Sequence, residues 1–354
     1  MDIAVAVAQF VLGLALIFVS LTSAFRTVVL PRAAFDPLTR IIFLGFRSML
    51  LWASRLSTRH LSQEDVLAVH APLGLLTLAL TWALGIMLGF ALLFDATGEI
   101  GFGRALILAG SSFTTLGFES PEQGIHEVLT ISAAVLGLGV VALLIAYLPT
   151  IYGLFSKREV VVADISIKSG GVAYGPDLVR HLIRDGDPIR LDEMCMHWEH
   201  WLIALGETHT AEPSLNFFRS PRSDRSWLTA ATAVLDAAII RNAVVAAPFS
   251  ARADMAYRAG VEAIVDIGRF FLTGPDGAEP TGQLVSRHDL EVEIAKMEAA
   301  GCPIVEDRDE AWQTFTSQRS AYEHELRGLH ELIQPPAAPW SSGPSDGREP
   351  DTRR

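Results

Sequence analysis

A run of hydroxyl side chains that ends in a glycine stands out in the first third of the chain. Ser111, Ser112, Thr114 and Thr115 precede Leu116-Gly117-Phe118. The two adjacent β-branched threonines and the glycine disfavour a continuing helix, so we expect extended backbone here. Carbonyl oxygens of such a backbone can replace the hydration shell of a cation. The chemistry that these residues predict is therefore cation coordination.

The segments around this run must position it. Apolar stretches long enough to cross about 30 Å of hydrocarbon occupy 3–25, 70–94 and 128–155. Between the last two, small apolar residues predict a short helix over 103–110. A helix that enters a bilayer and returns as irregular backbone is tolerated only where it is buried in protein or lines a water-filled cavity. The sequence therefore predicts three spans and one re-entrant pore loop.

Two of these spans carry further signals. The first could instead be a signal peptide, but it begins with Asp2, has no basic residue before it and has no clear cleavage site after it. In the second, the Gly85-x-x-x-Gly89 spacing would permit close approach of another helix.

Charge predicts the orientation of the spans. Six arginines lie between Arg26 and Arg59, and Lys157-Arg158 follow the third span. Because basic segments stay on the inner side of a membrane, we expect the N-terminus outside and the C-terminal region in the cytoplasm. Within the first basic segment, 38–56 mixes apolar residues with arginines. It predicts either a helix on the inner membrane surface or a helix packed on the soluble part.

The segment Thr114-Thr115-Leu116-Gly117-Phe118 resembles the selectivity-filter signature of pore-loop potassium channels, Thr-Thr-Val-Gly-Tyr/Phe-Gly. The resemblance covers 70–155. It implies an outer helix over 70–94, an inner helix over 128–155, a homotetramer in a lipid bilayer, and potassium as the permeant ion with no other cofactor. It also implies that Thr115 offers a hydroxyl and a carbonyl to the inner ion site. Leu116, Gly117 and Phe118 would offer carbonyls further out.

The chain departs from this signature at Glu119, where the second glycine is expected. A non-glycine residue in a left-handed conformation costs about 1–2 kcal/mol, so the outermost ion site should be altered or lost. Four Glu119 carboxylates would ring the outer mouth of a tetramer. The single-glycine pattern also resembles the filter repeats of Trk-type potassium transporters, which carry four repeats in one chain. This chain has one, so four copies would have to meet.

Three residues of the third span are candidate gating hinges. Gly137 and Gly139 interrupt its middle, and Pro149 removes a backbone hydrogen bond near its inner end. Packing relief for a neighbouring element explains the glycines almost as well.

The chain divides by composition into four parts. We expect an N-terminal span with a cytoplasmic interfacial helix (1–69), a pore domain (70–156), a mainly helical cytosolic domain (157–333) and a disordered tail (334–354). Alternation over 159–167 predicts one strand. Helices are expected over 176–185, 190–206, 225–246, 252–273, 287–301 and 308–333. A cluster of Cys195, His197 and His200, with His209 further on, matches no metal motif, and we interpret its histidines as surface residues.

Bulk composition excludes several classes of function. The net charge of −12 argues against a nucleic-acid partner. Two cysteines cannot build a disulfide framework or a four-cysteine zinc site. The chain has no P-loop and no catalytic triad that we can identify, so we do not expect an enzyme. The sequence predicts an all-α protein of the plasma membrane that conducts monovalent cations. The alternative is a non-conducting membrane protein with a relic pore loop, whose cytosolic domain binds a partner or ligand that the sequence does not identify.

Overall fold

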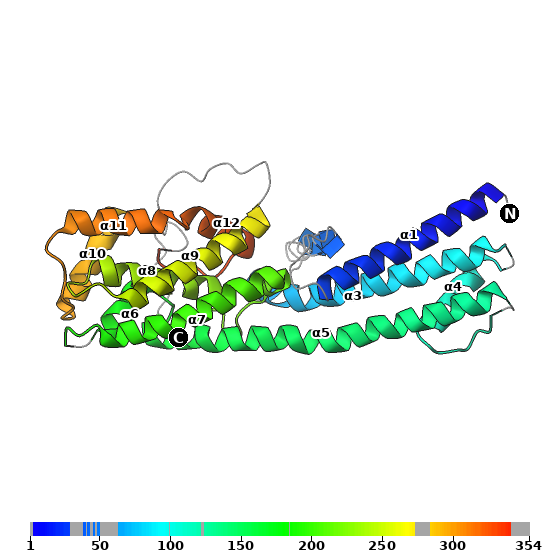
Figure 1. The fold of residues 1–354 in the computed structure, drawn as a ribbon, viewed down its shortest axis with the longest axis horizontal. Coiled ribbons are helices and arrows are strands. Elements are labelled where there is room, and N and C mark those ends of the chain that lie inside the picture. Colours follow the sequence, from blue (N-terminus) through cyan, green and yellow to red (C-terminus); the bar gives the residue numbers. More distant parts are fainter. Residues whose placement is uncertain are drawn as a thin grey trace. The chain divides into compact units, whose positions relative to one another are not determined.

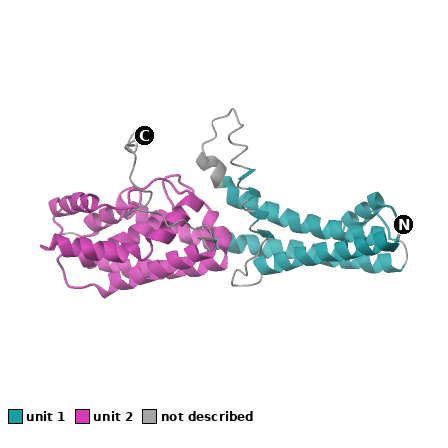
Figure 2. Cartoon of the chain, turned by 90° about the horizontal axis from the view of Figure 1, so that it is seen from above, with its two compact units in different colours: residues 1–153 teal, residues 154–354 magenta. Residues whose placement is uncertain are grey.

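The computed structural model describes residues 3–28, 38–39, 41–42, 45–46, 48–49, 63–98, 100–121, 124–183, 185–272 and 284–340. Within these ranges the elements are helices, with one isolated antiparallel bridge between Val245 and Ile304 (Figure 1). The all-α prediction is therefore confirmed. The chain forms two compact units, Met1–Gly153 and Leu154–Arg354, and α5 contributes residues to both (Figure 2).

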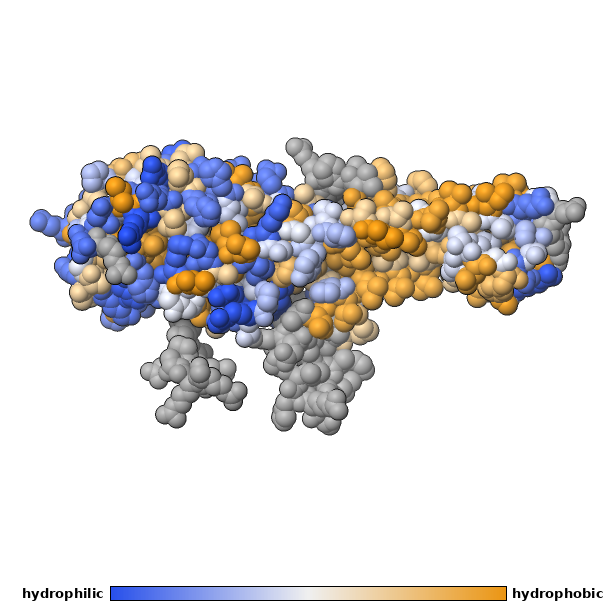
Figure 3. Space-filling view, turned by 90° about the horizontal axis from the view of Figure 1, so that it is seen from below, coloured by the Kyte–Doolittle hydropathy of each residue, from blue (hydrophilic) through white to orange (hydrophobic). Residues whose placement is uncertain are grey.

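The first unit contains three helices that are long and apolar enough to cross a membrane. They are α1 (Ile3–Val28), α3 (Gln63–Ala96) and α5 (Ile125–Ser169). Each includes one of the three apolar stretches predicted to span, so the prediction of three helices of spanning length is confirmed. In the view of Figure 3, apolar side chains cover much of the surface of this unit. Such a surface is stable in contact with hydrocarbon and not with water.

Glycines bring α1 and α3 into close contact, as the Gly85-x-x-x-Gly89 spacing predicts. A Cβ atom on Gly89 would lie 2.8 Å from the carbonyl oxygen of Gly13, and one on Gly85 would collide with the Ser20 hydroxyl. The indole N–H of Trp82 donates a hydrogen bond of 2.9 Å to Ser23 Oγ across the same interface. Small residues that let backbones approach are the usual device for helix pairing in lipid.

A short helix, α4 (Phe102–Phe113), packs back along these spans. A Cβ on Gly110 would lie 3.5 Å from Met87 Sδ in α3, and one on Gly137 in α5 would collide with the carbonyl of Phe113. Met87 is nine residues before the end of α3, and Gly137 is twelve residues after the start of α5. At 1.5 Å per residue, the end of α4 thus lies about 14 Å from the C-terminal end of α3 and about 18 Å from the N-terminal end of α5, measured along those helices.

The second unit is a helical bundle built around α8 (Trp227–Ala243). Every residue of α8 from Trp227 to Arg241 is buried, as expected for a central helix that is predominantly apolar. It is contacted by α6 (Gly175–Leu182), α7 (Ile189–Ala211), α9 (Ala251–Leu272) and α11 (Arg308–Ser320). The remaining elements are η1 (Pro213–Phe217), α10 (Arg287–Ala299) and α12 (Glu323–Ile333).

The strand predicted over 159–167 is wrong, because α5 continues as a helix to Ser169. Val162 and Ile165 are fully buried, whereas Val160 and Ile167 are exposed. The buried pair is three residues apart, which is a helical spacing. Apolar residues occupy enough positions here to fit both the two-residue period of a strand and the 3.6-residue period of a helix. The helix forms because its apolar face packs against the bundle.

The predicted disorder of the tail is wrong for its first residues. Trp340 is only 7% exposed, and its ring packs edge-on against Tyr174 and Phe315 at centroid distances of 5.3 and 5.6 Å. Its carbonyl accepts a hydrogen bond from Arg319. Residues 341–354 lie outside the described part of the chain, as does most of the helix predicted over 38–56. The helix predicted over 308–333 is divided into α11 and α12.

Candidate functional site

The hydroxyl run lies at the end of α4 and in the turn that follows. Ser111 and Ser112 belong to the last turn of α4, and Thr114 caps it. The amides of Leu116 and Gly117 both donate to the carbonyl of Ser111, at 3.0 and 3.3 Å. The hydroxyl of Thr114 donates to the carbonyl of Gly110 at 2.7 Å. The helix does end within the run, as predicted, but it continues to Phe113, three residues beyond the predicted end at Gly110. A hydrogen-bonded turn follows it, and not the extended backbone that the sequence predicts.

Backbone handedness alternates along this turn. Thr115 has φ +58° and Gly117 has φ +70°, whereas Leu116 between them is not in the left-handed region. For threonine that conformation costs about 1–2 kcal/mol. Strained backbone of this kind persists only where the surrounding structure holds it, and it is concentrated at functional sites.

The side chains of the turn face away from the rest of the unit. Leu116 is 70% exposed and Phe118 is 66% exposed. Exposed large apolar side chains in a unit with spanning helices require either lipid or another protein surface to cover them. Within the described residues of one copy, that cover is missing.

Glu119 is paired within its own chain. Its carboxylate accepts a hydrogen bond of 2.8 Å from Arg104 Nε at the start of α4, and its amide donates to Ser111 Oγ at 3.2 Å. The charge of the Glu119 carboxylate is therefore offset by an arginine. A ring of four such pairs would attract cations less than the four bare carboxylates that the sequence predicts.

The three hinge candidates lie within the continuous helix α5. Gly137 lies against the carbonyl of Phe113, so the packing explanation accounts for it. A Cβ on Gly139 would have no atom within 4 Å, and Pro149 lies inside the helix.

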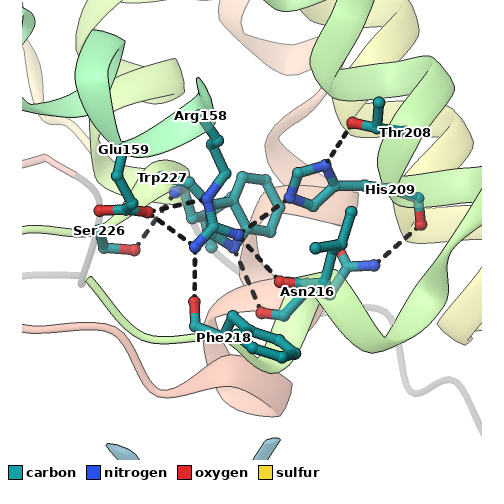
Figure 4. Close-up of polar contacts among 10 residues, drawn as sticks. Arg158, Glu159, Thr208, His209, Asn216, Phe218, Ser226 and Trp227 are labelled. Carbon is teal, nitrogen blue, oxygen red and sulfur yellow. Dashed lines mark hydrogen bonds and ion pairs between the residues drawn. The ribbon is translucent and has the colours of Figure 1, made fainter. Parts of the chain in front are cut away.

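A second polar site, which the sequence does not predict, lies in the second unit around Arg158 (Figure 4). Arg158 is only 4% exposed, although the sequence marks it as part of the basic inner flank of a span. Its guanidinium donates to the carbonyls of Leu215 and Phe218 at 2.9 and 2.7 Å, and it pairs with Glu159 at 2.7 Å. Burial lowers the pKa of Arg158, and Glu159 opposes that shift.

His209 completes this site. Its Nε2 lies 3.1 Å from Arg158 Nη1, and its Nδ1 lies 3.0 Å from the carbonyl of Leu205. Because arginine can only donate, Nε2 must accept and Nδ1 must carry the proton. Burial and the adjacent Arg158 lower the pKa of His209 well below its usual value. The ring also packs on Trp227, with 4.9 Å between centroids.

The interpretation of the histidines as surface residues is correct for His197 and His200 and wrong for His209. A signal for this was present in the sequence. His209 lies four, seven and eleven residues after Leu205, Leu202 and Trp198, which are all buried on one face of α7. The burial of Arg158 has no comparable signal.

The remaining polar groups of the second unit, as far as the structure describes them, do not meet the requirements of a metal site. The described residues contain no group of three or more histidine, cysteine or acidic side chains placed to hold a metal ion. Cys195 and Cys302 are buried free thiols, and burial raises the pKa of Cys195 to about 12. A thiol with this pKa is a poor nucleophile at neutral pH.

Comparison with known proteins adds no relative. No family model, no curated protein and no solved structure matches the chain.

Proposed function

We propose that the chain is one subunit of a homotetrameric channel that conducts monovalent cations, with potassium as the permeant ion, across the plasma membrane. In this proposal α4 is the pore helix and Thr114–Phe118 is the selectivity filter. The N-terminus lies outside and the second unit lies in the cytoplasm, as the arginine distribution predicts.

The observation that carries the proposal is the depth of α4 between the two spans. Its last residue, Phe113, lies beside Gly137 of α5, and the chain then returns to the start of α5 at Ile125. This path supports the proposal of a re-entrant loop. Irregular backbone at such a depth is tolerated only when it lines a cavity or is covered by protein.

Two further features of the turn support cation binding. The last turn of α4 carries no basic residue, so its negative dipole end is not neutralised by a side chain. The alternating handedness at Thr115 and Gly117 turns successive carbonyls in a way that regular backbone cannot. Both features favour a cation near the end of α4.

The exposure of α5 supports assembly. Only 17% of its most apolar window is buried within one copy, against 44% for α3. A single copy cannot surround a pore, and the single filter segment requires four copies. Lipid and neighbouring subunits would together cover α5 and the exposed Leu116 and Phe118.

The test is potassium flux through purified protein in lipid vesicles. Gly117→Ala meets no steric obstacle, because a Cβ there has no atom within 4 Å. It does force alanine into the left-handed region, which costs about 1–2 kcal/mol at the proposed ion site, so flux should fall tenfold or more. Gly153→Ala, also free of neighbours and not one of the hinge candidates, is the matched control and should conduct like wild type. Equal flux in both variants would contradict the filter assignment.

The second candidate function is a non-conducting membrane protein with a relic pore loop. The Arg104–Glu119 ion pair favours it, because the pair places an arginine beside the proposed outer mouth. Absence of flux from wild-type protein that assembles as a tetramer would support this alternative.

A further inference from the structure

We propose that the loop Phe218–Arg225 binds the headgroups of anionic phospholipids at the membrane surface next to the end of the α5 span. The proposal requires that α5 crosses the bilayer, but it does not require that the protein conducts ions. Two observations support the proposal: the contacts that hold the loop against α5, and the arginines that the loop carries.

Arg158 and Phe155 hold the loop against α5. Arg158 donates to the carbonyls of Leu215 and Phe218, and the rings of Phe155 and Phe218 pack with 5.4 Å between centroids. Lys157 is the first charged residue of α5 after Glu127. The loop is therefore fixed to α5 within one helical turn of the end of its uncharged stretch. If α5 crosses the membrane with its uncharged stretch, the residues at the end of that stretch lie in the headgroup region.

The loop carries three arginines at a spacing of three residues. Arg219, Arg222 and Arg225 are accompanied by one acidic residue, Asp224, in a chain whose net charge is −12. Exposed Lys157 adds a further positive charge on α5. A basic segment in an acidic protein, next to a span, is the pattern that attracts anionic lipids.

The three arginines have different roles. Arg219 donates to the carbonyls of Ile333 and Gln334 and so caps the end of α12. Arg222 has a side chain that is 63% exposed, and its guanidinium donates two hydrogen bonds to the Asp224 carboxylate, at 3.0 and 2.7 Å. The Nε atom of Arg225 is buried and has no hydrogen-bond acceptor among the described residues. Arg222, the exposed arginine of the loop, is thus the residue that we expect to contact lipid phosphate, while Arg225 adds positive charge near Asp224 and Arg219 shapes the loop.

A lipid headgroup fits better than a free anion. Phe155 and Phe218 form an apolar pair where the arginine-bearing loop meets α5, and apolar and basic groups together suit a molecule that is part hydrocarbon and part phosphate.

The test uses the purified full-length protein in detergent, titrated with short-chain phosphatidylglycerol, with the melting temperature as the readout of binding. At about 1 kcal/mol per arginine, Arg222→Gln together with Arg225→Gln should weaken the apparent affinity about 30-fold. Asp224→Asn removes the acidic residue of the loop and should strengthen the apparent affinity for the lipid about fivefold. Raised salt should weaken binding to wild type.

The matched control is Arg190→Gln together with Arg252→Gln, which makes the same charge change at exposed positions. These residues begin α7 and α9, and each lies 19 residues before His209 or Phe271, so about 28 Å from the ends near the loop. The control should bind like wild type. Equal weakening in the control, an equal effect of phosphatidylcholine, or an equal effect of inorganic phosphate alone would each overturn the proposal.

Discussion

Arg158 shows how one residue can bind several segments together. Its guanidinium is shared among two carbonyls, Glu159 and His209, which come from α5, α7 and the end of η1. Buried backbone carbonyls without a donor destabilise a fold, so the arginine stabilises all of these segments at once.

Replacing this arginine should therefore be strongly destabilising. Arg158→Leu leaves Glu159 unpaired and two carbonyls without a donor, and removing one partner of a buried pair costs about 3–5 kcal/mol. The melting temperature of the second unit, measured on the full-length protein, should fall by several degrees. The adjacent Lys157→Gln, at an exposed position, is the control and should leave it unchanged. A small effect of Arg158→Leu would mean that water satisfies these groups.

Two histidines, the buried His209 and the half-buried His330, predict a loss of stability in acid. Burial lowers the pKa of His330 to about 4, and burial together with Arg158 lowers the pKa of His209 well below its usual value. The unfolded chain then binds more protons than the folded one below about pH 6.5. For His330 the loss extends from pH 6.5 to about 4 and amounts to about 3 kcal/mol.

This loss can be measured as the pH dependence of the melting temperature. Between pH 7 and pH 4, His330→Gln should lose less stability than wild type, because glutamine does not titrate. His197→Gln, at an exposed position, should follow the wild-type curve. Parallel curves for all three proteins would show that acid acts through other groups.

At the scale of elements, the contact of α4 with α5 decides where the candidate filter lies. Gly137 makes this contact possible, because a Cβ there would collide with the carbonyl of Phe113. Gly137→Ala should therefore separate the two helices and cost about 1–3 kcal/mol, the usual range for overpacking.

Gly139, two residues along the same helix, is the comparison position. Gly139→Ala meets no atom within 4 Å and should stabilise α5 slightly, since alanine favours helix over glycine by about 1 kcal/mol. Thermal unfolding of both variants in detergent measures the difference. If Gly137→Ala were as stable as Gly139→Ala, then α4 would not pack against α5 as described.

At the scale of the whole molecule, the orientation in the membrane follows from the arginines between Arg26 and Arg59 and can be tested by cysteine labelling of intact cells. The two native cysteines are buried and should not react. Ser120→Cys, at an exposed position before α5, should be modified by a membrane-impermeant reagent from outside. Ser320→Cys, at an exposed position in the second unit, should be modified only after the cells are opened. The reverse pattern would contradict the predicted topology.

Several properties of this protein are determined by its sequence because they are local. A run of about 20 apolar residues is long enough to span a bilayer whatever surrounds it. Gly85 and Gly89 lack a Cβ in every context, and close packing with α1 follows. The end of α4 near Thr114 is local too, because β-branched residues and glycine disfavour a helix by their own geometry.

Other properties required the tertiary structure because they depend on partners distant in the sequence. The alternating segment 159–167 is helical because Val162 and Ile165 meet the bundle core. Arg158 is buried because acceptors more than 50 residues away surround its guanidinium. Trp340 is ordered because Tyr174 and Phe315 form its packing site. The sequence contains each of these residues, but burial is a property of the contacts between segments, and only the folded chain brings those contacts together.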